Sequence, residues 1–294
     1  MQMQQAVIGF GELLWDMLPA GRQLGGAPAN FCYQVMKQGL PALPVSCVGN
    51  DDLGRDALHL LRQAGLETAG IATGNHPTGT VAVTLDDRGI PEYDICEGVA
   101  WDYIALTAAA IDAAKSAAAL CYGTLAQRSE QSAATLQTLF ELLPTGAIRV
   151  FDVNLRQHYY STDILKQGCH HADILKLNDD ELPIVCGLLG IAAPEDILAP
   201  HDDRPHPDID KMRDHYKIGT VLVTCGARGS LVASEQGWSW LASVPIDVVD
   251  TIGAGDAFTA GFVAGILAGE SHADSQRRAT AAAARACTHA GAMG

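Results

Sequence analysis

The sequence predicts an α/β fold in three layers (α/β/α), with a mostly parallel central sheet between two layers of helices. Strand-like and helix-like runs alternate through most of the 294 residues, the order expected of parallel strands joined by covering helices. Apolar residues make up 48% of the chain, ample for the core of such a fold. Two short segments break the alternation. We therefore expect one domain over residues 1–294 with a small β lid inserted in it.

The expected strands are apolar runs bounded by turn residues, and the expected helices have apolar residues at helical spacing. The strand-like runs are residues 6–10, 43–48, 80–85, 119–124, 148–153, 174–178, 220–225 and 230–234. The helix-like runs are residues 28–38, 54–65, 129–143, 179–190, 255–268 and 276–290. In open sheets of this kind, ligands bind beyond the carboxyl ends of the strands.

Residues 13–24 and 79–99 are expected to form the lid. The segments TVAVTL and IPEYDI alternate apolar and polar residues, are joined by Asp86–Gly89, and predict antiparallel strands. An ordinary surface hairpin is the alternative on the sequence alone. Whether the lid edge pairs with a second copy to make a homodimer stays open. Residues 197–216, rich in Pro, Asp and His, predict a loop leading into a short helix, without assigned function.

The composition limits the expected partners. A formal charge of −15 without a cluster of Lys and Arg argues against binding to nucleic acid or an anionic membrane. The first residues lack the pattern of a signal peptide, and no run reaches the roughly 18 apolar residues of a membrane span, so we expect a cytoplasmic protein. The eight cysteines show no CxxC spacing, which predicts free thiols rather than disulfides or zinc ligands.

Residues 250–262, DTIGAGDAFTAGF, predict a phosphate site at the start of a helix. Gly253, Ala254 and Gly255 carry little or no side chain, so their amides can turn together toward an anion. The helix that follows adds unpaired amides and the positive end of its dipole. Asp256 in its first turn would lie beside the phosphate and could accept a proton from an attacking hydroxyl. A simple helix cap is the alternative role for this Asp.

A second group of candidates lies near the N-terminus. In LGGAPAN, Gly25 and Gly26 precede a helix and let the backbone pass close to a ligand, toward which Asn30 would point its carboxamide. Asp16, in GELLWDMLP, could accept hydrogen bonds from two neighbouring sugar hydroxyls. On its own a Gly-Gly pair is a weak signal, since turns contain most of them.

Two motifs follow strands in the middle of the chain. FDVNLR carries Asn154 and Arg156, and an extended chain would place both side chains on the same side. Arg can bind phosphate through two parallel N–H bonds, and Asn can hold a phosphate or a hydrated metal. LKLNDDEL carries Asn178 and Glu181 at a helix start, where the local sequence favours a capping box.

A further motif, VTCGARGS, places Thr224, Gly226 and Gly229 in a strand–turn–strand. Alone it predicts only a hairpin with two glycines. Other nucleotide signatures are missing, because the chain has no GxxxxGK[ST], and the residues 9–14 lack the third glycine of a dinucleotide-binding fingerprint.

In this order the motifs resemble those of the ribokinase-like carbohydrate kinases, the PfkB family. DTIGAGDAFTAGF resembles the family's C-terminal signature, and the spacing of GELLWD and LGGAPAN resembles the sugar site of its fructokinase branch. The match runs from Gly9 to Ala290. Departures are Ile252, where small or polar residues are also common, and the lack of an aromatic pair for a nucleobase acceptor. The resemblance implies a ribokinase-like fold.

The resemblance also implies the cofactors. Glu181 and Asn178 of the NxxE motif would help to hold hydrated Mg²⁺ beside the phosphates of ATP, to which Asn154 would contribute through water. The nucleotide loop would place Thr224 near the phosphates and Gly226 beneath the ribose or adenine, with Gly229 in the same loop. The C-terminal helix would form part of the adenine wall. A K⁺ site near Asp250 and Ile252 is left open.

The sequence therefore predicts an ATP-dependent sugar kinase, with fructose as the expected acceptor and fructose 6-phosphate as the product. Asp256 would be the base, Arg156 would neutralise phosphate charge, and the lid would exclude water. A phosphorylated acceptor would need more basic residues than Arg22 and Arg88 of the lid. Ribose, 2-keto-3-deoxygluconate and adenosine remain alternative acceptors. A catalytically silent sugar- or nucleotide-binding relative is the alternative of another class.

Overall fold

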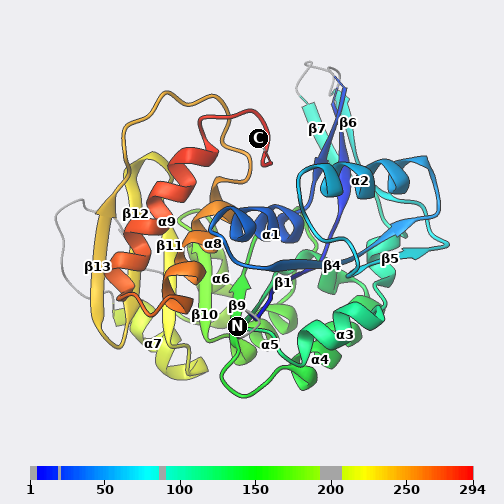
Figure 1. Ribbon diagram of the computed structural model, residues 1–294. Helices are drawn as coiled ribbons and strands as arrows, with labels where there is room; N and C mark the ends of the chain where they lie inside the picture. The colour runs from blue at the N-terminus through cyan, green and yellow to red at the C-terminus, as the bar shows by residue number, and fades with distance from the viewer. Residues whose placement is uncertain (1–4, 19–20, 86–90, 193–206, 294) are drawn as a thin grey trace.

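The computed structural model describes residues 5–18, 21–85, 91–192 and 207–293, and its centre is a nine-stranded sheet (Figure 1). The strands from β11 to β5 run parallel, and β12 and β13 extend the sheet antiparallel. In order across the sheet they are β13 (Gly237–Ala242), β12 (Gly229–Ser234), β11 (Thr220–Thr224), β10 (Ile174–Asn178), β9 (Ile148–Asp152), β8 (Ala119–Tyr122), β1 (Val7–Phe10), β4 (Ala42–Gly49) and β5 (Ile71–Gly74).

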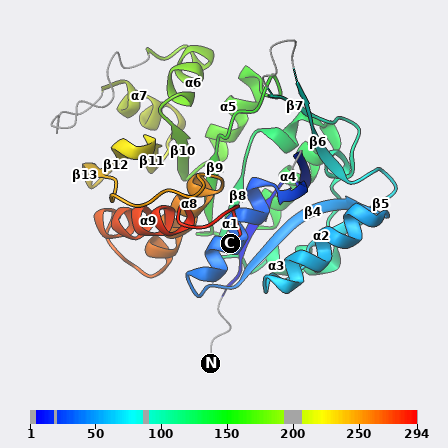
Figure 2. The same cartoon turned by 90° about the horizontal axis from the view of Figure 1, so that it is seen from above.

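Helices cover both faces of this sheet, and the view from above shows the two layers on either side of strands β9–β13 (Figure 2). One layer consists of α1 (Ala27–Lys37), α2 (Asp52–Gln63), α8 (Ala254–Leu267) and α9 (His272–Ala286). The other consists of α3 (Ala108–Ala114), α4 (Glu130–Leu142), α5 (Thr162–His171), α6 (Glu181–Leu189) and α7 (Pro207–Tyr216).

The strands are apolar on both faces because each face packs against helices. In β8, Leu120 and Tyr122 belong to one hydrophobic cluster, whereas Ala119 and Cys121 belong to the other. This alternation follows from the two-residue period of a strand. The predicted three-layer fold is therefore confirmed, and the continuous apolar runs in the sequence are explained by burial on both faces.

The lid is a separate four-stranded sheet. Its order is β3 (Gly21–Gly25), β2 (Leu14–Leu18), β6 (Gly79–Leu85) and β7 (Pro91–Ile95). Strands β6 and β7 pair antiparallel, as predicted, and stand away from the main sheet (Figure 1). The predicted turn at 86–89, with Arg88, lies outside the described residues.

All eight predicted strand runs correspond to strands, but β5, β13, α3 and α5 were not predicted as elements. Helix α9 begins at His272, four residues before the expected start at 276, because the Ser271 hydroxyl accepts a hydrogen bond from the Asp274 amide (3.1 Å). The short helix expected after the Pro-rich segment is α7, and residues 193–206 lie outside the described part. Within the described ranges no helix has the length and apolar character to cross a bilayer. All eight cysteines are free, as predicted.

Candidate active site

A cavity of about 1160 Å³ lies between the lid and the carboxyl ends of the main strands. Residues that follow β1, β9, β10 and β11 line it, and so do residues of the lid strands. It brings together every site residue that the sequence predicts: Asp16, Gly25, Gly26, Asn30, Asn154, Arg156, Asn178, Glu181, Thr224, Gly226, Gly229, Gly253, Ala254, Gly255 and Asp256.

The start of α8 has the geometry of an anion site. Gly253 adopts a left-handed conformation (φ 79°), and a Cβ there would lie 2.6 Å from the Cβ of Ala292, so only glycine fits. The amides of Ala254, Gly255 and Asp256 lie in the first turn, which lines the cavity, and the Ala254 amide donates to the Thr251 carbonyl (3.2 Å). Backbone amides of a first helical turn lack helical acceptors and favour an anion.

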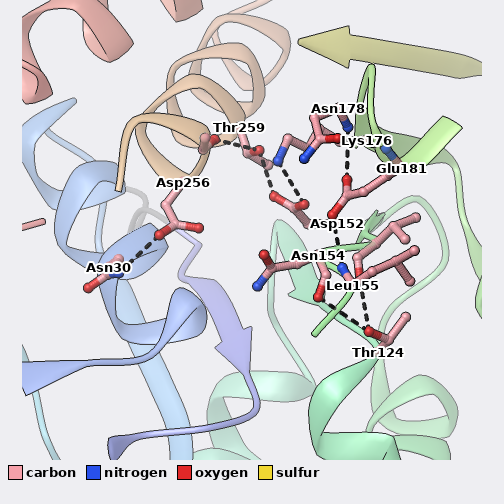
Figure 3. Close-up of polar contacts among 12 residues, drawn as sticks. Asn30, Thr124, Asp152, Asn154, Leu155, Lys176, Asn178, Glu181, Asp256 and Thr259 are labelled. Carbon is pink, nitrogen blue, oxygen red and sulfur yellow. Dashed lines mark hydrogen bonds and ion pairs between the residues drawn. The ribbon is translucent and has the colours of Figure 1, made fainter. Parts of the chain in front are cut away.

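Asp256 lines the cavity and is hydrogen-bonded to a residue of α1. Asn30 Nδ2 donates a hydrogen bond to Asp256 Oδ2 (3.0 Å, Figure 3). Burial, followed by repulsion from Asp152, raises the pKa of Asp256 to about 6, against the opposing effect of the Asn30 hydrogen bond. A carboxyl group with a pKa near 6 can accept and release a proton close to neutral pH. Asn30, predicted to face a sugar, also orients Asp256.

A buried ion pair behind the anion site was missed by the sequence analysis. Lys176 Nζ lies 2.9 Å from Asp152 Oδ1, and the Thr259 hydroxyl of α8 donates to Asp152 Oδ2 (3.0 Å, Figure 3). Burial opposes the charge of Lys176, but the attraction of Asp152 and nearby carboxylates raises its pKa. A Cβ on Gly255 would lie 3.1 Å from Lys176 Nζ, so the ammonium lies directly beneath the anion site.

Glu12 is a second residue that the sequence analysis missed. It is buried, lines the cavity, and its Oε1 accepts a hydrogen bond from the Ala27 amide at the start of α1 (3.1 Å). Burial raises its pKa to about 7, although its backbone hydrogen bonds and Arg156 oppose the rise. The available signal was a charged residue inside the apolar run of GELLWD.

The turn after β9 differs from the extended chain that we expected. Asn154 and Gln157 adopt left-handed conformations (φ 43° and 47°), so the backbone bends, and the prediction of two side chains aligned by an extended chain is wrong. The bend still directs both Asn154 and Arg156 into the cavity. Attraction to the Arg156 guanidinium opposes the burial-induced rise in the pKa of Asp16. Arg156 is therefore positioned among the carboxylates of the cavity.

Asn178 and Glu181 form the capping box that the local sequence favours. Asn178 Oδ1 accepts from the Glu181 amide and Glu181 Oε2 accepts from the Asn178 amide, both at 2.8 Å. Glu181 Oε1 also accepts from the Leu155 amide (2.9 Å), which ties the turn after β9 to the start of α6. Among the described residues no group of three His, Cys, Asp or Glu side chains could hold a metal by itself. The oxygens of Asn154, Asn178 and Glu181 are of the hard type that Mg²⁺ takes as ligands.

The far end of the cavity lies between the hairpin β11–β12 and α9. Gly226 adopts a left-handed conformation (φ 54°), and Gly229 has no room for a side chain beside the backbone of β13. Thr280 and Cys287 of the C-terminal helical region line this end, opposite apolar residues of the loop after β13.

The C-terminal residues close around the anion site. Asp250 Oδ1 accepts from the Ile252 amide (3.0 Å) and Oδ2 accepts from the Gly291 amide (2.8 Å). Gln34 Nε2 of α1 donates to the Ala292 carbonyl (3.1 Å). The loop before α8 is thus held in place by contacts with distant parts of the chain.

Comparisons with known proteins agree with this geometry. The family model described as pfkB family carbohydrate kinase matches residues 16–294. A fructokinase of Salmonella typhimurium is 30% identical over 273 residues, 88% of this chain and 83% of the relative. The structure of a Xylella fastidiosa fructokinase with bound ATP superimposes with a TM-score of 0.82 at 22% identity, over 99% of this chain and 94% of that one. The structure of a double mutant of a Vibrio cholerae fructokinase, in a form with fructose, ADP and potassium ion bound, superimposes with a TM-score of 0.79 at 23% identity. The match covers 99% of this chain and 94% of that one.

Proposed function

The chain belongs to the pfkB family of carbohydrate kinases, and we propose that it is an ATP-dependent kinase that converts fructose to fructose 6-phosphate. The observation that carries the proposal is the position of Asp256. This carboxylate lies in the first turn of α8 and lines the same cavity as Asp16 of the lid and Gly255 of the anion site. A hydroxyl at the lid end and a phosphate at the helix start would meet there.

In the proposed reaction, Asp256 accepts the proton of the primary hydroxyl of the sugar. The hydroxyl oxygen forms a bond to the γ-phosphorus while the bond from that phosphorus to the β,γ-bridging oxygen breaks, and ADP leaves. The amides of residues 253–256 stabilise charge on the transferred group, and Arg156 and Lys176 add positive charge nearby. Bound Mg²⁺ would neutralise charge on the phosphates, with Glu181 and Asn178 on its hydration shell and Asn154 reaching it through water.

A neutral sugar suits the lid end of the cavity. Glu12 and Asp16 offer carboxylate oxygens to hydroxyl groups, and a Cβ on Gly25 would lie 2.9 Å from Asp16 Oδ2, so Gly25 leaves that carboxylate accessible. The lid supplies apolar side chains, including Val81 and Ile95, for the faces of the sugar. A phosphorylated acceptor would be repelled by these carboxylates. The same chemistry leaves other neutral sugars as alternative acceptors.

ATP would bind from the anion site to the far end of the cavity. Thr224, at the end of β11, lies on the phosphate side, and Gly226 and Gly229 shape the loop against which the ribose and adenine would lie. A K⁺ ion near Asp250 and Ile252 would support the loop before α8. The potassium-bound fructokinase structure supports this part of the proposal for the family.

The function is tested by ADP release from MgATP with fructose, glucose, ribose, 2-keto-3-deoxygluconate and adenosine, with and without K⁺. We expect turnover with fructose to exceed that with each other acceptor. Turnover on adenosine but not on fructose would overturn the choice of acceptor. Binding of ATP with no turnover on any acceptor would favour the silent relative.

The rate should also depend on the protonation of Asp256. Because its pKa is raised to about 6, the form that can accept a proton is present above that pH and is lost as the pH falls. The logarithm of kcat/KM for the sugar should rise with a slope of about one and level off near pH 6. Replacing Asn30 with Ala removes a hydrogen bond that lowers this pKa, so the acid limb should move to higher pH.

The control for this pH profile is Glu12→Gln, since Glu12 is another carboxyl group of the cavity whose pKa is raised. The variant should keep an acid limb near pH 6. If the acid limb of the kcat/KM profile disappears in Glu12→Gln and does not move in Asn30→Ala, the group that titrates near pH 6 is Glu12 and not Asp256.

A further inference from the structure

A buried arginine lies beneath the lid, outside the residues to which the proposed reaction gives a role. Arg128 ends the 3-10 turn η2 (Leu125–Arg128), and its guanidinium forms two parallel bonds to Asp102, Nε to Oδ1 at 2.7 Å and Nη2 to Oδ2 at 2.9 Å. Both side chains are only 7% exposed. Removing both charges of such a pair from water costs free energy, so a buried ion pair need not stabilise the fold. The alternative role is to fix the positions of the elements that it joins.

Two aromatic rings hold the guanidinium in one orientation. Its central carbon lies 3.9 Å from the ring centre of Trp101 and 4.4 Å from that of Tyr159. A planar guanidinium can stack on both rings while its edge bonds a carboxylate, whereas an ammonium cannot. The site therefore requires Arg rather than any cation.

One side of this cluster holds the lid. Arg128 Nη2 donates to the Cys96 carbonyl (2.6 Å), directly after β7. The Tyr159 hydroxyl lies 3.2 Å from the Ile95 carbonyl and 2.9 Å from Glu97 Oε1. Trp101 packs against Gly79 at the start of β6, where a Cβ would collide with its indole nitrogen. Both strands of the β6–β7 hairpin thus rest on the cluster at their base.

The other side holds the turn that carries the phosphate-binding arginine. The Tyr159 amide donates to the Arg156 carbonyl (3.0 Å), so the residue whose ring stacks on Arg128 also closes the turn of Arg156 through its backbone. Leu125, in the same 3-10 turn as Arg128, lines the cavity with Ile95. The lid and the Arg156 turn are therefore both fixed to one guanidinium.

We propose that Arg128 is a positioning residue that sets the base of the lid hairpin relative to the turn of Arg156, so that sugar and γ-phosphoryl group are held in line. This inference rests on the proposed function. A displaced lid would bind sugar less tightly and would admit water to the phosphoryl group. The nucleotide end of the cavity, which other elements build, would be unaffected.

The test compares Arg128→Lys with the wild type, measuring ADP and sugar phosphate separately. The variant should lower kcat/KM for the sugar by about tenfold or more, chiefly through a higher KM, and should release more ADP than sugar phosphate. The Kd for MgADP should stay within about twofold. The control is Arg149→Lys: Arg149 makes the same two-bond pair with Asp173 (both 3.0 Å) at the amino end of β9, away from the cavity, and its variant should keep wild-type kinetics.

Tyr159→Phe provides a second variant if Arg128→Lys does not fold. It keeps the ring on Arg128 but loses the bonds to the lid, so it should shift KM and the ADP to sugar phosphate ratio in the same direction by a smaller factor. The inference would be overturned if a folded variant kept the wild-type KM for the sugar, released ADP and sugar phosphate in a ratio of one, and differed only in a lower melting temperature. Failure of the wild type to phosphorylate any sugar would instead count against the proposed function, and sugar affinity of the variants would then decide the role of Arg128.

Discussion

Replacing Asp256 with Asn should lower kcat by on the order of a hundredfold or more while leaving the affinity for sugar nearly unchanged. The amide has almost the same shape, so it can keep a contact with Asn30, but it cannot accept the proton of the attacking hydroxyl. The helix start and its amides stay in place. Steady-state kinetics and calorimetric titration with the sugar measure the two effects separately.

The matched control is Asp274→Asn. Asp274 occupies the same position in the first turn of α9 that Asp256 occupies in α8, but it lies on the surface, where it pairs with Arg277. Its substitution should leave kcat within about twofold. Near-full activity of Asp256→Asn would show that this carboxylate only caps its helix, which is the alternative that the sequence alone left open.

Replacing Lys176 with Met should lower the free energy of unfolding by about 3–5 kcal/mol, because it leaves the buried Asp152 carboxylate without its partner. The two side chains are 8% and 9% exposed, and Asp152 would keep the hydrogen bond from the Thr259 hydroxyl. Denaturant unfolding followed by circular dichroism measures the loss. Activity should fall as well, because the ammonium lies against Gly255 in the anion site.

Two further variants distinguish the loss of a buried ion pair from the loss of a lysine charge at the surface. Lys115→Met removes an ion pair with Asp112 that is exposed and 3.5 Å long, and should cost about 1 kcal/mol or less. The double variant Asp152→Asn, Lys176→Met removes both charges and should be more stable than Lys176→Met alone. A double variant no more stable than the single one would mean that the loss comes from packing of the lysine chain.

Much of the fold could be predicted because its signals are local. Runs such as ILKLN in β10 and the capping box at Asn178 and Glu181 depend only on neighbouring residues. The elements that escaped prediction have weak local signals. Strand β5 has only four residues, follows Gly70 and ends in Gly74, and α3 consists mostly of Ala, which gives no pattern of apolar and polar faces.

The site residues also differ in whether their signals in the sequence are local. Asp256 and the glycines before it could be predicted because they follow one another in the sequence. Lys176, Asp152 and Glu12 could not, because the meaning of each depends on a partner elsewhere, such as the pair of Lys176 with a residue 24 positions away. Each stood out only as a charged residue within an apolar run. Arg128 was hidden for the same reason, since its partners are distant in the sequence: Trp101 and Asp102 lie in one turn before it, and Tyr159 follows β9.

The bond between Asn30 and Asp256 joins residues that are 226 positions apart. Contacts of such long range close late, because the entropy of the intervening chain has to be lost before they form. The orientation of Asp256 therefore depends on how α1 packs against α8, two helices that come from opposite ends of the chain.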